Sequence, residues 1–415
     1  MTPDLLGEGQ ELLAHIQGLV AREGPITFRR FMALALYHPH YGYYTRPGAR
    51  MGREGDYVTS PEVHPVFGYA VAEQVLEMWE AMGRPRPFTL VEPGAGTGAL
   101  AQAVLRWARQ RASELYDSLR YVLLEASPHL RDRQRQALAA YEDRVSWRRS
   151  LPRGIVGCFL QNELFDSFPV HRVAVEGGAL REVYVDFREG RLQELLGAPS
   201  TPRLAAYFRR LGIWSGEGCR AEVNLAALDF MARIARALER GFALTFDYGY
   251  EAQQIFVPWR REGTLMAFYR HNPSHDPYAR PGRQDLTSHV DFTSLIEAGR
   301  RHGLEPLGLT TQARFLSALG IGQEMAQEED LEGYYARRRA LVELLDPASL
   351  GRIKVLLQAK GVARVSLRGL EESNEVALQE ALCHSERSEE STGAQSELRE
   401  GSQPAGQPDP SLLSG

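Results

Sequence analysis

Hydrophobic residues in the first part of the chain recur at the spacing of amphipathic helices. Apolar side chains repeat every three or four positions from Leu5 to Val20, and a second pattern of this kind runs from Ile26 until Pro39. Proline cannot continue a helix because it lacks the backbone N–H. A loop rich in glycine and proline follows, and helical spacing returns from Val66 to Met82. The pattern predicts a helical N-terminal layer over residues 1–85, with the loop as a lid.

The pattern changes near Phe88, where short apolar runs begin to alternate with helical segments. Such runs are typical of strands that are buried on both faces of a sheet, and helices between them predict parallel neighbours. We therefore expect an α/β fold with a doubly wound sheet. The runs expected as strands are residues 88–92, 120–125, 144–148, 155–161 and 242–248, with a last pair at 304–312 and 352–360.

An insertion follows the fourth of these strands. Residues 170–196 alternate between apolar and polar positions and contain two turns, at Gly177-Gly178 and Glu189-Gly190. Strand-like alternation joined by glycine turns predicts a β-meander. We expect this insertion, about residues 170–225, on the substrate side of a core that spans residues 86–362.

Composition and charge narrow the class of protein. The 415-residue chain has a formal net charge of -5, which argues against nucleic-acid binding driven by charge. Its three cysteines lie far apart, so no metal or redox spacing is present, and we expect no metal site. No apolar run is long enough to span a membrane. The oligomeric state does not follow from the sequence.

The two ends of the chain are polar. The N-terminus lacks the basic and apolar regions of a secretory signal, so we expect a cytoplasmic protein. Residues 363–415 are rich in Ser, Glu, Gln, Gly and Pro. Such a composition cannot bury enough apolar surface to fold, so we expect a mostly disordered tail.

A glycine-rich loop joins the first expected strand to the following helix. Glu92 ends the strand, and Gly94, Gly96 and Gly98 follow at alternate positions. Glycines at such a turn let the backbone touch a ligand, and the helix start offers free N–H groups. A dinucleotide site would have the spacing Gly-x-Gly-x-x-Gly and a pyrophosphate, which Glu92 would repel. The acid favours a cation such as S-adenosyl-L-methionine; a helix-entry turn without function is the alternative.

A second acid, Glu125, ends the next expected strand. A carboxylate at this place can accept hydrogen bonds from both hydroxyls of a ribose. NAD-binding folds share the feature, so it does not separate the two cofactors. A solvated strand end is the structural alternative.

Polar residues also follow the fourth and fifth strands, where ligands of a doubly wound sheet bind. Asn162, Glu163 and Asp166 come after the fourth strand, and the two acids are three residues apart, which places them on one face of a turn. The alternative is an N-capping Asn with a solvated acidic first turn. Asp247 and Tyr248 end the fifth strand at the edge of the cleft. A turn Asp and a half-buried Tyr would explain them equally well.

Several segments together resemble the MidA family of class I S-adenosylmethionine-dependent methyltransferases. This resemblance extends from about Gly24 to Lys360, and the blocks GDYVTSPEV and DLTSHVDF are its specific part. The family is related to the mitochondrial complex I assembly methyltransferase, which implies a Rossmann-like class I sheet and methyl transfer to a protein arginine. The segments are residues 23–48, 52–74, 91–101, 161–172, 246–250, 263–271 and 285–295.

The resemblance assigns roles to the residues already singled out. It places the cofactor motif on the loop from Glu92 to Gly98 together with Glu125, and the NELFD block on Asn162, Glu163 and Asp166. That block is similar to the first half of the acidic loop of arginine methyltransferases. The second glutamate of that loop has no counterpart here, because Pro169, Val170 and His171 follow instead.

Two carboxylates can hold a guanidinium group bidentately, so we expect Glu163 as its chief ligand and Asp166 as support. Ser60 and Glu62 are expected to close over the cofactor, and Tyr248 to line the substrate side. Ser60 as an N-cap followed by Pro61 would be the simpler explanation of that segment.

The predicted function is S-adenosylmethionine-dependent methylation of a protein arginine, with a respiratory complex I subunit as the substrate that the resemblance implies. The alternatives are an NAD-dependent oxidoreductase, a small-molecule methyltransferase and a non-catalytic assembly factor with the same fold. A bacterial protein would act in the cytoplasm and a eukaryotic one in the mitochondrial matrix.

Overall fold

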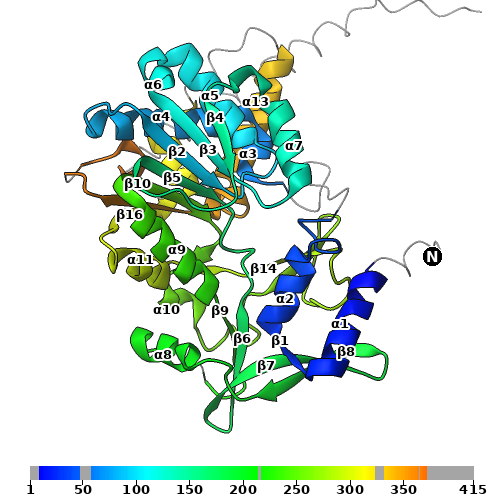
Figure 1. Cartoon of the computed structure of the whole chain (residues 1–415). Coiled ribbons are helices and arrows are strands. Elements are labelled where there is room, and N and C mark those ends of the chain that lie inside the picture. Colours follow the sequence, from blue (N-terminus) through cyan, green and yellow to red (C-terminus); the bar gives the residue numbers. More distant parts are fainter. Residues whose placement is uncertain (1–8, 47–57, 214–215, 323–330, 364, 372–415) are drawn as a thin grey trace, which may run out of the picture. The chain divides into compact units, whose positions relative to one another are not determined.

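The computed structural model describes residues 9–46, 58–213, 216–322, 331–363 and 365–371. Its central element is a seven-stranded sheet with the order β16-β17-β10-β5-β2-β3-β4 (Figure 1). Neighbouring strands from β10 to β4 are parallel, and β17 is antiparallel to both of its neighbours. The expected doubly wound α/β sheet is confirmed. The strands are β2 (Phe88–Pro93), β3 (Leu119–Leu124), β4 (Val145–Arg148), β5 (Ile155–Asn162), β10 (Leu238–Asp247), β16 (Glu305–Thr311) and β17 (Lys354–Lys360).

Helices cover both faces of this sheet because its central strands are apolar on both sides. Along β5, Cys158 and Leu160 pack into one core, whereas Phe159 between them packs into the other. The first core includes α4 (Pro65–Ala81), α5 (Ala99–Arg111), α12 (Gln312–Ala318) and α13 (Leu331–Leu345). The second includes α8 (Pro202–Leu211), α9 (Leu225–Ala237) and α11 (Phe292–Arg300).

The predicted meander is a second, separate sheet. Strands β6 (His171–Glu176), β7 (Ala179–Arg188) and β8 (Arg191–Gly197) pair antiparallel in sequence order. The residues of both turns, Gly177-Gly178 and Glu189-Gly190, have positive φ, which matches the right-handed twist of the flanking strands. Two further strands, β1 (Ile26–Thr27) and β9 (Arg220–Val223), extend this sheet.

The N-terminal helices divide between the two sheets. The apolar faces of α1 (Gln10–Glu23) and α2 (Phe28–Tyr37) share a core with β7 of the meander. By contrast, α3 (Ser60–Val63) and α4 join the core of the seven-stranded sheet. Figure 1 shows α1 and α2 beside the meander strands. Helical spacing identified these helices, but it did not predict that they pack against different sheets.

Short elements complete the described part of the chain. A three-stranded sheet consists of β12, β13 and β14, and β11 pairs with β15. Within the described residues, no helix is long and apolar enough to cross a membrane. Residues 47–57 of the expected lid loop, and residues 364 and 372–415 of the tail expected over residues 363–415, lie outside the described residues. The described start of that tail is ordered: Leu367 is buried in the first core, and Arg368–Leu370 form a short 3-10 helix. The remaining elements are α6 (Ser113–Ser118), α7 (Pro128–Ala137), α10 (Ala252–Ile255), β11 (Gly249–Tyr250), β12 (Met266–Tyr269), β13 (Asn272–Ser274), β14 (Asp285–Thr287) and β15 (Val290–Asp291).

Candidate active site

The glycine loop joins β2 to α5 in a conformation that side chains disfavour. Gly94, Gly96 and Gly98 have φ values of 69°, 54° and 87°, all in the left-handed region. A Cβ atom at Gly94 would also lie 2.8 Å from Leu164 Cδ1. Gly98 is the N-cap of α5, and no side chain caps this end of the helix. The first N–H groups of α5 therefore remain available to a ligand.

The two acids that flank the loop are held by neighbouring polar side chains. The Tyr121 hydroxyl donates to Glu92 Oε2 at 2.7 Å. Ser127 N and Gln134 Nε2 donate to Glu125 at 2.9 and 3.3 Å. Gln134 Nε2 also lies 2.8 Å from the carbonyl oxygen of Gly96, so one amide connects the second acid to the glycine loop. Burial raises the pKa of Glu92 to about 8 and raises the pKa of Glu125.

The short helix α3 lies over the glycine loop and the end of β5. The Thr97 hydroxyl donates to the Glu62 carboxylate, and Ser60 N donates to Glu163 Oε1 at 3.1 Å. The buried Ser60 hydroxyl donates to Gln312 Oε1 at 2.9 Å. The N-cap position belongs to Thr59, so the interpretation of Ser60 as an N-cap is wrong.

The segment after β5 turns sharply at Glu163, whose φ of 46° is rare for a residue with a side chain. Asp247, at the end of β10, holds this turn. Its carboxylate accepts hydrogen bonds from the backbone N–H groups of Leu164 and Phe165 at 3.1 and 2.7 Å, and from that of Tyr248 at 2.9 Å. Asp247 thus has a structural role that the sequence left open.

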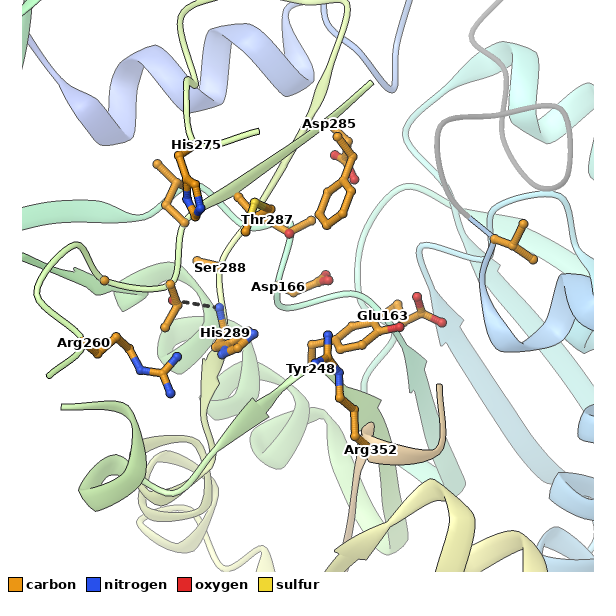
Figure 2. A pocket seen from close by; sticks show the side chains of 16 residues that line it. Glu163, Asp166, Tyr248, Arg260, His275, Asp285, Thr287, Ser288, His289 and Arg352 are labelled. Atoms are coloured by element: carbon orange, nitrogen blue, oxygen red, sulfur yellow. Dashed lines mark hydrogen bonds between the residues drawn. The ribbon is translucent and has the colours of Figure 1, made fainter. Parts of the chain in front are cut away.

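A cavity of about 380 Å³ lies beside this turn (Figure 2). Glu163, Asp166 and Tyr248 line it, as expected from their places after β5 and β10. Sequence reasoning missed the other polar residues of its wall. They come from distant segments, and only Thr264 and the block from Asp285 to His289 carried a signal, through their places in the resemblance. The missed polar residues are Arg260, Thr264, His275, Asp285, Thr287, Ser288, His289 and Arg352.

A second, smaller hollow lies between α3 and the glycine loop. Its lining includes Glu62, Glu92, Gly94, Gly96 and Asn162, together with Glu163. Glu163 therefore lines both spaces, whereas Asp166 lines only the larger one. Glu125, Ser60 and Gly98 are absent from both linings. Glu125 and Ser60 reach the site through their hydrogen bonds, and Gly98 is the N-cap of α5 beside Gln134.

The carboxylates around the larger cavity are unusually basic. Burial, together with the charges of Asp247 and Asp285, raises the pKa of Glu163 to about 8. Burial and the charges of Asp247, Glu163 and Asp285 hold the pKa of Asp166 well above its usual range. Mutually repelling acids in a buried site favour a bound cation, because it stabilises their ionised forms. Buried carboxylates of this kind also mark candidate functional sites.

Comparison with known proteins identifies the family. A family model described as "Putative S-adenosyl-L-methionine-dependent methyltransferase" matches residues 70–310. The chain belongs to this family. A crystal structure from Burkholderia thailandensis, bound to S-adenosyl-homocysteine, is similar to this methyltransferase with a TM-score of 0.82 and 32% identity, over 89% of this chain and 96% of the other.

Two curated relatives carry a more specific name. The methyltransferase is 30% identical over 400 residues to "Protein arginine methyltransferase NDUFAF7 homolog, mitochondrial" of Drosophila melanogaster, over 86% of each chain. It is also 30% identical over 373 residues to the mouse protein arginine methyltransferase NDUFAF7, over 82% of each chain. The resemblance inferred from the sequence motifs is confirmed.

The cofactor of the methyltransferase is S-adenosyl-L-methionine, and the chemistry of the smaller hollow's lining suits it. Asn162 Oδ1 is buried and has no hydrogen-bond partner among the described residues, so it can accept from an ammonium group. Glu92 and the main chain at Gly94 and Gly96 line the hollow, and an acid beside bare backbone suits a cationic cofactor. These features argue against the dinucleotide alternative, since a pyrophosphate would meet carboxylates.

Proposed function

We propose that this methyltransferase modifies an arginine side chain of a protein, with Glu163 and Asp166 as the residues that hold the guanidinium group. The observation that carries the proposal is the position of Glu163, which lines both the cofactor hollow and the larger cavity. A group held by Glu163 in the larger cavity would be next to the methyl donor. The names of the NDUFAF7 relatives support an arginine as the acceptor.

The cofactor side would be divided among the residues of the loop and the strand ends. Bound S-adenosyl-L-methionine supplies an electrophilic methyl group. We assign the sulfonium side to Glu92, the ribose hydroxyls to Glu125, and the ammonium group to Asn162. Gly94, Gly96 and Gly98 give the cofactor access to the backbone. The hydrogen bonds of Ser60 and Glu62 keep α3 over the hollow and exclude water.

The acceptor side would orient and activate the guanidinium. Glu163 and Asp166 accept its N–H groups and draw positive charge toward the nitrogens that face them, which leaves electron density on the attacking nitrogen. After transfer the methylated nitrogen loses a proton, and Asp166, which is a carboxylate when it holds the guanidinium, can take that proton. Tyr248 forms part of the wall beside Glu163 and fixes the position of the acceptor.

A respiratory complex I subunit is our proposed protein substrate. The relatives named for NDUFAF7 are mitochondrial proteins. For a bacterial chain we propose the cytoplasm as the place of action, and for a eukaryotic chain the mitochondrial matrix.

The test is a Glu163→Gln variant, assayed with labelled cofactor on a cell lysate and by calorimetry. We expect cofactor affinity to stay within about threefold, because glutamine keeps its size and an oxygen that can accept from Ser60 N, and protein labelling to be lost, because the acceptor loses its carboxylate. Glu189→Gln is a matched control, since Glu189 is an exposed glutamate with a similar φ of 53°. Loss of cofactor binding in the Glu163 variant, or unchanged labelling, would contradict the proposed role.

A further inference from the structure

The larger cavity has a cationic end that methyl transfer does not use. Arg260, His289 and Arg352 line it together with Glu163 and Asp166. Figure 2 shows the Arg260 side chain on the opposite side of the cavity from Glu163, with His289 between them in this view. The cavity thus carries Glu163 on one side and the Arg260 guanidinium on the other, with Arg352 beside Tyr248.

Aromatic rings flank these cations. The Arg260 guanidinium lies 5.8 Å from the centre of the Tyr250 ring, and the Arg352 guanidinium lies 5.7 Å from that of Tyr248. The His289 ring packs against Tyr250 at 5.3 Å. Stacking fixes the position of a guanidinium group but leaves its N–H donors free for an anion.

No carboxylate forms an ion pair with Arg260 or Arg352 within the described part of the chain. The nearby Arg172 is different, because it pairs with Glu194 at 2.7 Å. Three buried side-chain atoms of the cavity wall, Arg260 Nε, Ser288 Oγ and His289 Nδ1, also have no hydrogen-bond partner among the described residues. Buried polar atoms are rarely left without partners, so such a cluster points to an absent ligand.

The surroundings of His289 agree with a cationic end. Burial, Arg260 and Arg352 lower its pKa to about 4, so the imidazole is neutral at pH 7 and can donate one N–H. An anion bound between the two guanidinium groups would counter their charges and so raise the pKa of His289 again.

We propose that the end of the cavity formed by Arg260, Ser288, His289 and Arg352 binds a carboxylate of the substrate, so that the enzyme selects an arginine accompanied by an acidic group in the same protein segment. This inference rests on the proposed function, because it places the target arginine at Glu163. Arginine binds carboxylates bidentately, which suits this end. The carboxylate could belong to an Asp or Glu side chain or to a chain terminus.

The test uses short synthetic peptides and calorimetry in the presence of S-adenosyl-homocysteine. Each acetylated, amidated peptide contains one arginine and one glutamate separated by zero to four glycines, and each has a counterpart with glutamine. A further set ends in a free carboxylate in place of the glutamate. We expect at least one spacing at which the carboxylate tightens binding about tenfold, and comparison of the two sets identifies the source of the carboxylate.

Arg260→Gln should remove this preference, while Arg261→Gln should keep it, because Arg261 is exposed and outside the cavity wall. Equal affinities in all pairs, or no binding of any peptide, would overturn the inference. A preference that survives Arg260→Gln, or a loss of cofactor affinity in that variant, would overturn it as well. Labelling of lysate proteins by the wild-type enzyme tests the proposed function separately, so the two failures are distinguishable.

Discussion

The two spaces that meet at Glu163 are built in different ways. On the cofactor side, Glu92 accepts a hydrogen bond from the Tyr121 hydroxyl and has one acidic neighbour, Glu125. On the acceptor side, Glu163 accepts from Ser60 N and Asn162 Nδ2, but Asp166 is repelled by three acids, Asp247, Glu163 and Asp285. The acceptor side therefore has the larger concentration of acids, and a cation bound there relieves more repulsion than one on the cofactor side.

Asp166 and Asp247 show the same contrast between two buried acids. The Asp247 carboxylate accepts three backbone hydrogen bonds and holds the turn at Glu163. The side chain of Asp166 lines the cavity, and its backbone oxygen accepts a hydrogen bond from Ser288 N at 3.0 Å. Burial therefore does not distinguish a structural acid from a functional one; the hydrogen-bond partners do.

The largest effect should come from filling the cofactor hollow. We expect Gly96→Val to weaken S-adenosyl-L-methionine binding by more than about a hundredfold in calorimetry, because Gly96 lines the hollow with a φ of 54°. Gly177→Val is the matched control, since Gly177 has a φ of 59° in an exposed turn. Both variants carry the backbone cost of a side chain at positive φ, but only the first should lose the cofactor. Equal cofactor affinities would show that the loop does not contact it.

The second prediction compares Asp247 with Asp166, whose substitutions should affect stability and turnover differently. Asp247→Asn should lower the free energy of unfolding by about 3 kcal/mol, because the amide places an NH₂ group against backbone donors. Asp166→Asn should leave stability unchanged or higher, since it removes a charge from a repelling cluster, yet reduce turnover at least about tenfold. Urea unfolding measures the stability of both variants, and steady-state labelling measures their turnover. A stability loss of the same size in both variants would remove the distinction between them.

The third effect is a pH dependence of stability. The pKa of Glu163 is about 8 in the folded protein, above the value of an exposed glutamate, so the folded state binds more protons between about pH 5 and pH 8. Unliganded protein should therefore lose stability as pH rises through this window, by at most about 1.4 kcal/mol per pH unit from this group. Urea unfolding of Glu163→Gln should show a shallower slope, and Glu189→Gln should retain the wild-type slope. Parallel slopes in all three proteins would contradict the raised pKa.

The cofactor side was largely predictable from sequence because its signals are local. The strand from Phe88, the glycines and the helix from Ala99 are contiguous, and the acids Glu92 and Glu125 end consecutive strands. The sheet was predictable for a related reason, since strands buried on both faces appear as apolar runs. The NELFD block was also predictable as part of a site. It directly follows a strand, and ligands of doubly wound sheets bind at the carboxyl ends of the strands.

The acceptor cavity was only partly predictable because its wall is assembled from distant segments. Arg260 follows α10, His275 follows β13, and Arg352 precedes β17, and none of them stands in a local pattern that indicates a site. Their meeting depends on how the short sheet of β12 to β14 packs. The helices α1 and α2 teach the same lesson, because helical spacing reveals an apolar face but not its partner.

The smallest effect concerns the attachment of α3, which lines the cofactor hollow. Ser60→Ala should lower stability by about 1 kcal/mol and raise the KM for the cofactor severalfold, because Gln312 Oε1 loses a buried donor at 2.9 Å. The backbone N–H of residue 60 still reaches Glu163, so turnover should persist. Ser317→Ala is the control, since that hydroxyl donates at 2.7 Å to Ala313 O within its own helix. An unchanged KM in Ser60→Ala, with the stability loss present, would show that this hydrogen bond supports the fold alone, and that α3 is held over the cofactor by its contacts through Glu62 and Glu163.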